Sequence, residues 1–359
     1  MEEPQHSSAQ PYLASDEYRP EPEAKPPNWL DGSTRIGIHT SIAGDICSAL
    51  DIANNLGANA LQIFSASPRM WSRGAVGSNA IAASSERFRA RRAELRLGPL
   101  VIHTNYLINL ASLQRVLRVR SIQAFHDEIV RAAALGADFL VMHPGCGCGA
   151  EMNAAIAAIA DGLKHAARGV KFGGLRILLE NTAGQGTSVG SRFSELRAIL
   201  DRCPELPLGV CVDTAHLFAA GHDLRRAEGL ERALAEIAAT VGLARVFVIH
   251  ANDSKGALGS HLDRHEHIGK GKIGREGFRR ILKHPQLAGR AFILETPIDR
   301  PGDDRRNVDT LWRLAGEKPR SVRGAVDGFA IRRRGARVHR KPGVARKARR
   351  HGNTKRRRG

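Results

Sequence analysis

Eight short apolar runs recur along the middle of the chain, and a stretch of different character separates each run from the next. The runs are rich in aliphatic and β-branched residues and are apolar almost throughout, which is typical of strands buried on both faces. Such a series strongly limits the folds that are open to the chain. The runs occupy residues 35–39, 60–65, 99–103, 138–143, 175–180, 208–213, 245–250 and 291–295.

The stretches between the runs place apolar residues three and four positions apart, as one buried face of a helix requires. Ile122, Phe125 and Ile129 follow this spacing, and Gly136 provides a C-terminal stop. Strands that alternate with helices predict right-handed βαβ units and a parallel sheet. Eight units favour a closed (β/α)8 TIM barrel, with an open doubly wound sheet as the alternative. No glycine-rich dinucleotide or phosphate loop follows the first run, which favours the barrel.

Charge and composition distinguish the two ends of the chain from this predicted barrel. The chain has 359 residues and a formal net charge of +19. Residues 1–30 hold six of the sixteen prolines and a net charge of −4, which predicts a disordered acidic leader. Residues 318–359 hold 17 basic residues and one acidic residue, which predicts a disordered basic tail. The predicted barrel, residues 31–317, is only mildly basic at +7.

Composition excludes several classes of protein. Hydrophobic residues make up 42% of the chain and charged residues 25%, which excludes a wholly disordered protein. No apolar stretch approaches the roughly 20 residues of a membrane span, and the acidic start does not resemble a secretory signal. Five cysteines, an odd number, do not form a disulfide framework, so we expect a reducing compartment.

Side chains that can bind metals stand at the ends of six of the eight predicted strands. All strands of a parallel barrel end on one face, where the active sites of such barrels lie, so these side chains should share one pocket. Any one histidine alone would indicate a hydrogen-bonded structural residue, but repetition at successive strand ends indicates a metal centre. With three residues from the loops just after strands, the candidate ligands are His103, His143, Glu180, Asp213, His216, His250, Asp263, His265 and Glu295.

The chemistry of these nine side chains limits the metal. Carboxylates and imidazoles gathered without a counter-charge would be costly, whereas divalent ions neutralise them. The set contains no thiolate, which favours zinc or manganese over an iron–sulfur cluster. Nine ligands suffice for two or three ions, and ions about 3.5–4 Å apart suit hydrolysis of a phosphate ester. His39 also ends a run but has no carboxylate near it in sequence, so we expect it to pack beneath the site.

Four long segments occur in the order and at the spacing of one known family. They read HTNYLINLA at 103–111, ENTAGQG at 180–186, GVCVDTAHLFAAGHDL at 209–224 and IHANDSKGALGSHLDRHEHIGKGKIG at 249–274. With these segments, the chain from about residue 35 to 297 resembles the endonuclease IV family. These enzymes are metal-dependent apurinic/apyrimidinic (AP) endonucleases of DNA base-excision repair. The resemblance implies a (β/α)8 barrel with a trinuclear zinc site.

The resemblance also distributes the nine ligands over three zinc ions, with manganese as the alternative at one or more sites. Glu180 and Glu295 would be the catalytic carboxylates, with Glu180 orienting the attacking hydroxide and Glu295 helping to position the water. The implied ligands are His103, His143 and Glu180 for the first ion, Glu180, Asp213, His250 and Glu295 for the second, and His216, Asp263 and His265 for the third.

The implied reaction is hydrolysis of the phosphodiester 5′ to an abasic site, leaving a 3′-hydroxyl and a 5′-deoxyribose phosphate. An abasic nucleotide is easier to extrude than an intact one, and inserted side chains can fill the space it leaves. Tyr106 and Leu107 match the family's intercalating positions, and Arg69 matches its other inserting residue. We expect a monomer, because the mouth must admit duplex DNA, and in a bacterial host a cytoplasmic, nucleoid-associated protein.

The chain departs from the family pattern at three places, none of which removes a ligand. Asn105 stands where serine is usual, Ala215 where cysteine is usual, and CGCG follows HPG where members often have serine and histidine. We expect Cys146 and Cys148 to be free thiols in a glycine-rich loop, because a disulfide between them would be strained.

Two other functions are compatible with parts of the sequence. A metal-dependent sugar isomerase or epimerase would share the barrel and its metal-bearing strand ends, but the third ligand group and the DNA-directed positions would be surplus. A DNA-compacting protein with a degenerate barrel would have lost ligands, and none is lost. The basic tail is expected to bind nucleic-acid phosphates non-specifically, with RNA binding, acidic-protein binding or a nuclear address as alternatives.

Overall fold

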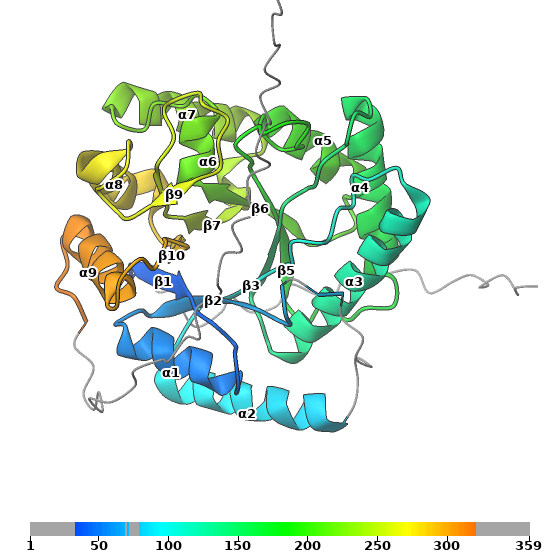
Figure 1. Cartoon of the computed structure of the whole chain (residues 1–359), viewed down its shortest axis with the longest axis horizontal. Coiled ribbons are helices and arrows are strands. Elements are labelled where there is room, and N and C mark those ends of the chain that lie inside the picture. The colour runs from blue at the N-terminus through cyan, green and yellow to red at the C-terminus, as the bar shows by residue number, and fades with distance from the viewer. Residues whose placement is uncertain (1–32, 69, 72–78, 321–359) are drawn as a thin grey trace, which may run out of the picture. The chain divides into compact units, whose positions relative to one another are not determined.

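Eight parallel strands close into a barrel in the computed structural model, which describes residues 33–68, 70–71 and 79–320 (Figure 1). The first strand, β1 (Arg35–His39), pairs with β2 (Ala60–Phe64) on one side and with β10 (Ala291–Leu294) on the other. This closure confirms the predicted (β/α)8 barrel and excludes the open sheet. The remaining strands are β3 (Leu100–His103), β4 (Phe139–Met142), β5 (Arg176–Glu180), β6 (Leu208–Asp213) and β7 (Val246–His250).

Helices surround the barrel on all sides in Figure 1, as expected from the helical spacing between the apolar runs. They are α1 (Cys47–Asn55), α2 (Asn79–Leu95), α3 (Arg115–Ala134), α4 (Met152–Ala167), α5 (Phe193–Arg202), α7 (Ala227–Thr240), α8 (Gly274–Lys283) and α9 (Asp303–Ala315), with the 3-10 turns Leu243–Arg245 and Pro285–Leu287. None of the helices in the described part of the chain is both long and apolar enough to cross a membrane. The proposed leader and nearly all of the proposed tail, whose first three residues are 318–320, lie outside the described residues.

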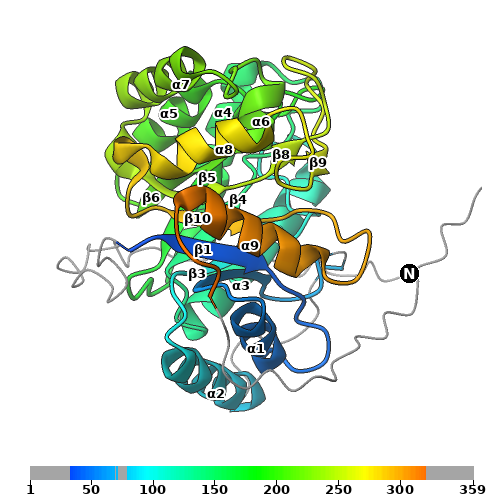
Figure 2. The ribbon, with the colours of Figure 1, turned by 90° about the vertical axis from the view of Figure 1, so that its left-hand side faces the viewer.

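A short insertion follows β7 at the end of the barrel where the strands finish. The helix α6 (Thr214–Ala219) starts directly after β6, and β8 (Asp253–Ser254) pairs antiparallel with β9 (His265–Glu266). Figure 2 shows this small ribbon close to α6. The insertion therefore brings the loop after β7 over the end of β6.

The strands are buried on both faces, as their continuous apolarity predicts. One large apolar cluster fills the space between strands and helices, and a smaller one fills the barrel interior. Gly37 leaves room inside the barrel, because a Cβ there would lie 2.4 Å from Ile293 Cδ1 and 2.8 Å from the carbonyl carbon of Ala60. The interior residues are Ala60, Val101, Phe139, Val141, Leu178, Cys211, Val248, Ala291 and Ile293.

Candidate metal centre

Each candidate ligand at a strand end lies two residues beyond an interior apolar side chain. Successive side chains of a strand point to opposite faces, so a residue two positions further on points into the same interior. The ligands therefore form the uppermost layer of the barrel interior, directly above its apolar filling. The pairs are Val101 and His103, Val141 and His143, Leu178 and Glu180, Cys211 and Asp213, Val248 and His250, and Ile293 and Glu295.

Glu180 lies at the centre of this layer and is fully buried. Its Oε2 atom lies 3.3 Å from Nε2 of His103 and 3.3 Å from Nε2 of His143. Its Oε1 atom lies 3.0 Å from Nδ1 of His250 and 3.4 Å from Nδ1 of His216. The two oxygens of one carboxylate thus face different imidazoles, which is the arrangement that a bridging ligand requires.

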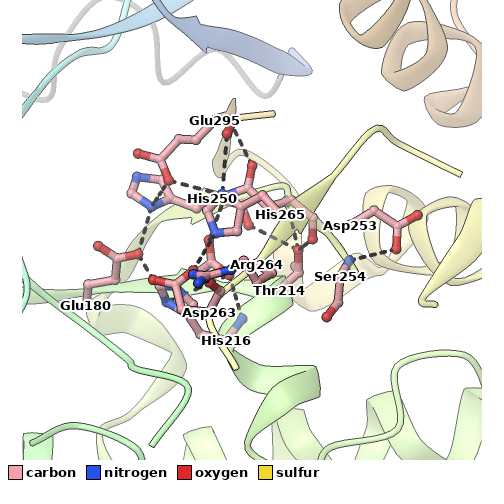
Figure 3. A network of polar contacts seen from close by, with 12 residues as sticks. Glu180, Thr214, His216, His250, Asp253, Ser254, Asp263, Arg264, His265 and Glu295 are labelled. Atoms are coloured by element: carbon pink, nitrogen blue, oxygen red, sulfur yellow. Dashed lines mark hydrogen bonds and ion pairs between the residues drawn. The ribbon is translucent and has the colours of Figure 1, made fainter. Parts of the chain in front are cut away.

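The structure brings all nine predicted ligands together. Figure 3 shows six of them, Glu180, His216, His250, Asp263, His265 and Glu295. Eight of the nine form three overlapping groups, and within each group the potential ligand atoms lie within 4.8 Å of one another. The ninth, Asp263, places Oδ1 3.2 Å from Nε2 of His216 and 3.4 Å from Nε2 of His265. The groups are His103, His143 and Glu180; Glu180, Asp213, His250 and Glu295; and Asp213, His216 and His265.

His216 and His265 each have a buried Nε2 atom without a hydrogen-bond partner among the described residues. The other ring nitrogen, Nδ1, faces a main-chain carbonyl in both cases, that of Asn181 at 2.9 Å and that of Glu295 at 3.3 Å. A carbonyl only accepts, so each Nδ1 carries a hydrogen, and each Nε2, which faces Asp263, is the nitrogen that can bind a metal once it has lost its proton. Two imidazole nitrogens and a carboxylate directed at one point suit a divalent cation such as zinc.

The carboxylates and imidazoles of the layer stabilise each other in their charged forms. Burial alone would lower the pKa of His216, but the negative charges of Asp213 and Asp263 outweigh it and raise the pKa to about 10. Burial would raise the pKa of Glu180, yet the charges of His143 and His250 hold it well below its usual range. Glu180 is therefore ionised, and a proton on His216 supplies positive charge that a divalent cation would replace on binding.

The carboxylate of Asp213 links the start of a helix to the ligand layer. It ends β6 and is the N-cap of α6, where its Oδ1 atom accepts a hydrogen bond from the main-chain N–H of His216 at 2.7 Å. Its Oδ2 atom faces the ligand layer, 3.6 Å from Nε2 of His265. A turn of helix that begins at the strand end thus places His216 beside the other ligands.

Comparison with known proteins agrees with this geometry. A family model described as a xylose isomerase-like TIM barrel matches residues 50–315. A protein from Solibacter usitatus named probable endonuclease 4 is 52% identical over 290 residues, which cover 79% of this chain and 98% of that protein. This chain belongs to the endonuclease IV family.

Solved structures place the chain in the same family and fold. Endonuclease IV from Thermus thermophilus is 40% identical, with a TM-score of 0.69 over 79% of this chain and 99% of that one. A D-tagatose 3-epimerase-like protein has a TM-score of 0.59 at 18% identity, covering 79% of this chain and 97% of that one. At that identity the second likeness shows a shared barrel and nothing about activity.

Gln62 is a residue of the endonuclease IV site that the sequence analysis missed. It lies on β2, two residues after the interior Ala60, and is fully buried. Its Oε1 atom accepts a hydrogen bond from Nε2 of His250 at 2.8 Å, and its Nε2 atom donates to Oε1 of Glu295 at 2.6 Å. This amide therefore leaves Nδ1 of His250 facing the ligand layer and fixes one oxygen of Glu295. His39, expected beneath the site, instead contacts the same amide, with its Nδ1 3.0 Å from Nε2 of Gln62.

Replacing Gln62 with leucine is expected to lower the affinity for Zn²⁺ about 10- to 100-fold, the usual cost of losing a partner behind a metal ligand. The leucine would remove the hydrogen bonds that Gln62 makes to His250 and Glu295. Competition with a chromophoric chelator measures the affinity, and Gln123→Leu, on the exposed face of α3, is the matched control. Equal affinity in both variants would show that Gln62 does not orient the ligands.

Asn252 and Asp253, directly after β7, support the site in different ways. Asn252 donates from Nδ2 to Oδ2 of Asp213 at 2.6 Å and accepts the main-chain N–H of Glu295 at 2.8 Å. Asp253 is buried and accepts main-chain N–H groups of Gly269 and Gly271 at 2.8 and 3.0 Å. In Figure 3 its carboxylate points away from the ligands, so it holds the following loop rather than a metal.

The candidate DNA-contacting residues lie in the loops after β2 and β3. Tyr106 is 67% exposed and meets the ring of Phe64 edge-on, with 5.4 Å between the ring centroids. Leu107 is half-buried, and its N–H donates to Oδ1 of Asn105 at 2.9 Å. Asn105, one of the departures from the family pattern, thus shapes this loop. Arg69 lies outside the described residues.

Proposed function

We propose that this chain is an AP endonuclease that hydrolyses the phosphodiester 5′ to an abasic site in duplex DNA, leaving a 3′-hydroxyl and a 5′-deoxyribose phosphate. The observation that carries the proposal is the convergence of nine His, Asp and Glu side chains around Glu180. It is supported by 52% identity to a protein named probable endonuclease 4. A monomeric, cytoplasmic enzyme that acts on duplex DNA is part of the same proposal.

The donor set suits three zinc ions, held by the three ligand groups with Asp263 completing the third, and Mn²⁺ is the alternative at one or more positions. When bound, the ions would activate the attacking water and stabilise charge on the attacking and leaving oxygens. Glu180 is ionised and faces imidazoles with both oxygens, so it can orient the water. Glu295, whose oxygens are held by Gln62 and Asn252, would help to position it.

The exposed ring of Tyr106 is placed to enter the DNA stack beside an extruded abasic nucleotide. It stands three residues after His103, so the same loop would connect the metal centre to the duplex. Leu107 would add an apolar wedge next to it, and Arg69 would act from the loop after β2. An aromatic ring can fill the vacant space whatever the neighbouring bases are, which suits a lesion that occurs in every sequence.

Tyr106→Ala is expected to weaken binding of abasic duplex about tenfold, because base–aromatic stacking contributes about 1–3 kcal/mol. Tyr106→Phe keeps the ring and is expected to bind like the parent. Fluorescence anisotropy in the presence of chelator measures binding without cleavage, and single-turnover kinetics at saturating protein should show a smaller change. Parental affinity in the alanine variant would remove Tyr106 from the interface.

We also propose that the basic tail binds DNA phosphates without sequence preference. Deleting residues 321–359 removes 15 basic residues and one acidic residue. The cut preserves Arg320, which donates to the Ala58 carbonyl at 3.3 Å. Affinity of the truncated protein is expected to fall less steeply with salt, because fewer counterions are released on binding. Its single-turnover rate at saturation should match that of the full chain. An unchanged salt slope would contradict a role for the tail in DNA binding.

The decisive experiment for the proposed function uses a labelled duplex with one tetrahydrofuran abasic analogue, incubated with purified protein without added magnesium. The analogue has no aldehyde, so a Schiff-base lyase cannot cut it. A single incision on the 5′ side that leaves a 3′-hydroxyl is expected. No cleavage by protein shown to contain its metals would overturn the proposal and direct attention to sugar isomerisation or epimerisation.

A further inference from the structure

Cys146 and Cys148 form a pair of thiols in the loop after β4, separate from the nine candidate ligands. Their sulfur atoms lie 3.6 Å apart, and no disulfide joins them. Cys148 is exposed and Cys146 is half-buried, whereas the other three cysteines of the chain are buried. The loop begins at His143, so the pair stands beside the metal centre in sequence, on the same end of the barrel.

The hydroxyl of Thr187 distinguishes the two sulfur atoms. Its oxygen accepts the main-chain N–H of Cys148 at 3.0 Å, and its hydroxyl hydrogen is free to donate to Sγ of Cys146, 2.9 Å away. The thiol of Cys148 donates to the same sulfur. Two donors directed at one sulfur stabilise its thiolate form. Although burial acts in the opposite direction, the Thr187 hydroxyl contributes to a lowered pKa of Cys146, and the hydrogen bond to Cys146 raises the pKa of Cys148.

The side chain of Asn109 holds the main chain of one cysteine, whereas the other cysteine lies between two glycines. Asn109 accepts the N–H of Cys146 through Oδ1 at 3.0 Å and donates to its carbonyl through Nδ2 at 2.9 Å. Cys148 lies between Gly147 and Gly149 and has a positive φ of 49°. A Cβ at Gly149 would meet no atom within 4 Å, so there is open space around this part of the loop.

We propose that Cys146 and Cys148 are a peroxide-reactive thiol pair that closes reversibly to a disulfide. The Cys146 thiolate attacks one oxygen of a hydroperoxide; the O–O bond breaks, the other oxygen leaves as hydroxide or alkoxide, and the sulfur is oxidised to a sulfenic acid. The sulfur of Cys148 then attacks that of Cys146. The S–O bond breaks, and hydroxide leaves and takes the Cys148 proton as water. A disulfide across one residue is strained, so cellular thiols would reduce it readily.

The test uses the full-length, metal-loaded protein, treated with hydrogen peroxide, quenched with iodoacetamide and analysed by peptide mass spectrometry. The peptide that contains both cysteines is expected to lose two hydrogens and to escape alkylation, and dithiothreitol should reverse both changes. In Cys148→Ser, dimedone should trap a sulfenic acid at Cys146. Thr187→Val, which lacks the hydroxyl, should react with peroxide about tenfold more slowly, because less of Cys146 is thiolate.

The metal content and thermal unfolding midpoint of each variant show whether it folds like the parent, independently of any nuclease activity. Full alkylation of both cysteines after peroxide would overturn the proposal. So would oxidation of Cys148→Ser without a dimedone adduct, or a Thr187→Val rate equal to that of the parent. Protection of both thiols by an additional bound zinc ion, released by chelator, would also overturn it and assign the pair to metal binding instead.

Discussion

Glu180→Gln is expected to lower the single-turnover rate of incision at an abasic site about a thousandfold or more, which corresponds to about 4 kcal/mol of lost transition-state stabilisation. The carboxylate faces His103 and His143 with one oxygen and His250 and His216 with the other. Glutamine has the same shape but no charge, and its amide nitrogen cannot serve as a ligand. Both ligand groups that share Glu180 should therefore lose affinity for metal along with the rate.

Glu195→Gln is the matched control for this substitution. Glu195 is also buried, but it accepts the N–H of Gly190 at 2.8 Å, which a glutamine oxygen can still do. We expect this variant to keep the parental rate and metal content. Circular dichroism and the thermal midpoint verify that both variants are folded. A Glu180→Gln enzyme with the parental rate would remove Glu180 from the mechanism.

Removing the metals is expected to abolish incision and to lower the thermal unfolding midpoint by roughly 10 °C. A ligand present at about a thousand times its dissociation constant stabilises the folded state by about 4 kcal/mol, and for a large domain each kcal/mol shifts the midpoint by about 2–4 °C. The physical reason is the cluster of carboxylates around Glu180, whose negative charge bound cations would neutralise. Dialysis against chelator followed by calorimetry and the incision assay measures both effects.

Elemental analysis of the untreated protein should find three equivalents of metal per chain, and Asp263→Asn should reduce this to two. Restoring activity with Zn²⁺ or Mn²⁺ separately identifies the metals that support the reaction. A chelated protein with no detectable metal, full activity and an unchanged midpoint would contradict the assignment of a metal centre.

The barrel and the convergence of the side chains at its strand ends could be predicted because both follow from short-range regularities. Continuous apolar runs indicate strands buried on both faces, and parallel closure then places every strand end on one face. His103 and Glu295 stand almost two hundred positions apart, yet that rule alone brings them together. Asp263 and His265 do not stand at the end of a barrel strand, so strand closure does not predict their position. The resemblance to a known family supported their prediction as ligands.

Gln62 could not be predicted in the same way, although it obeys the two-residue spacing of the ligands. An amide is not a preferred ligand for zinc, so a search for metal-binding side chains passes over it. Its role depends on two partners, His250 and Glu295, that lie 188 and 233 positions away. The sequence also cannot show which ring nitrogen of His216 and His265 faces the site, because main-chain carbonyls of other segments determine it. Arg69 stays a prediction.

The double role of Asp213 has a consequence for the redesign of this enzyme. One side chain both starts α6 and faces the ligands, and a helix cap of this kind is worth about 0.5–2 kcal/mol. A shift of the carboxylate toward His265 would lengthen its hydrogen bond to the main-chain N–H of His216. Replacing Asp213 to obtain a centre with fewer ions would therefore also destabilise the first turn of α6. That turn carries the backbone of His216. The two oxygens of this carboxylate serve the helix and the ligand layer respectively. A redesign would therefore have to provide another N-cap for α6 before it replaced Asp213.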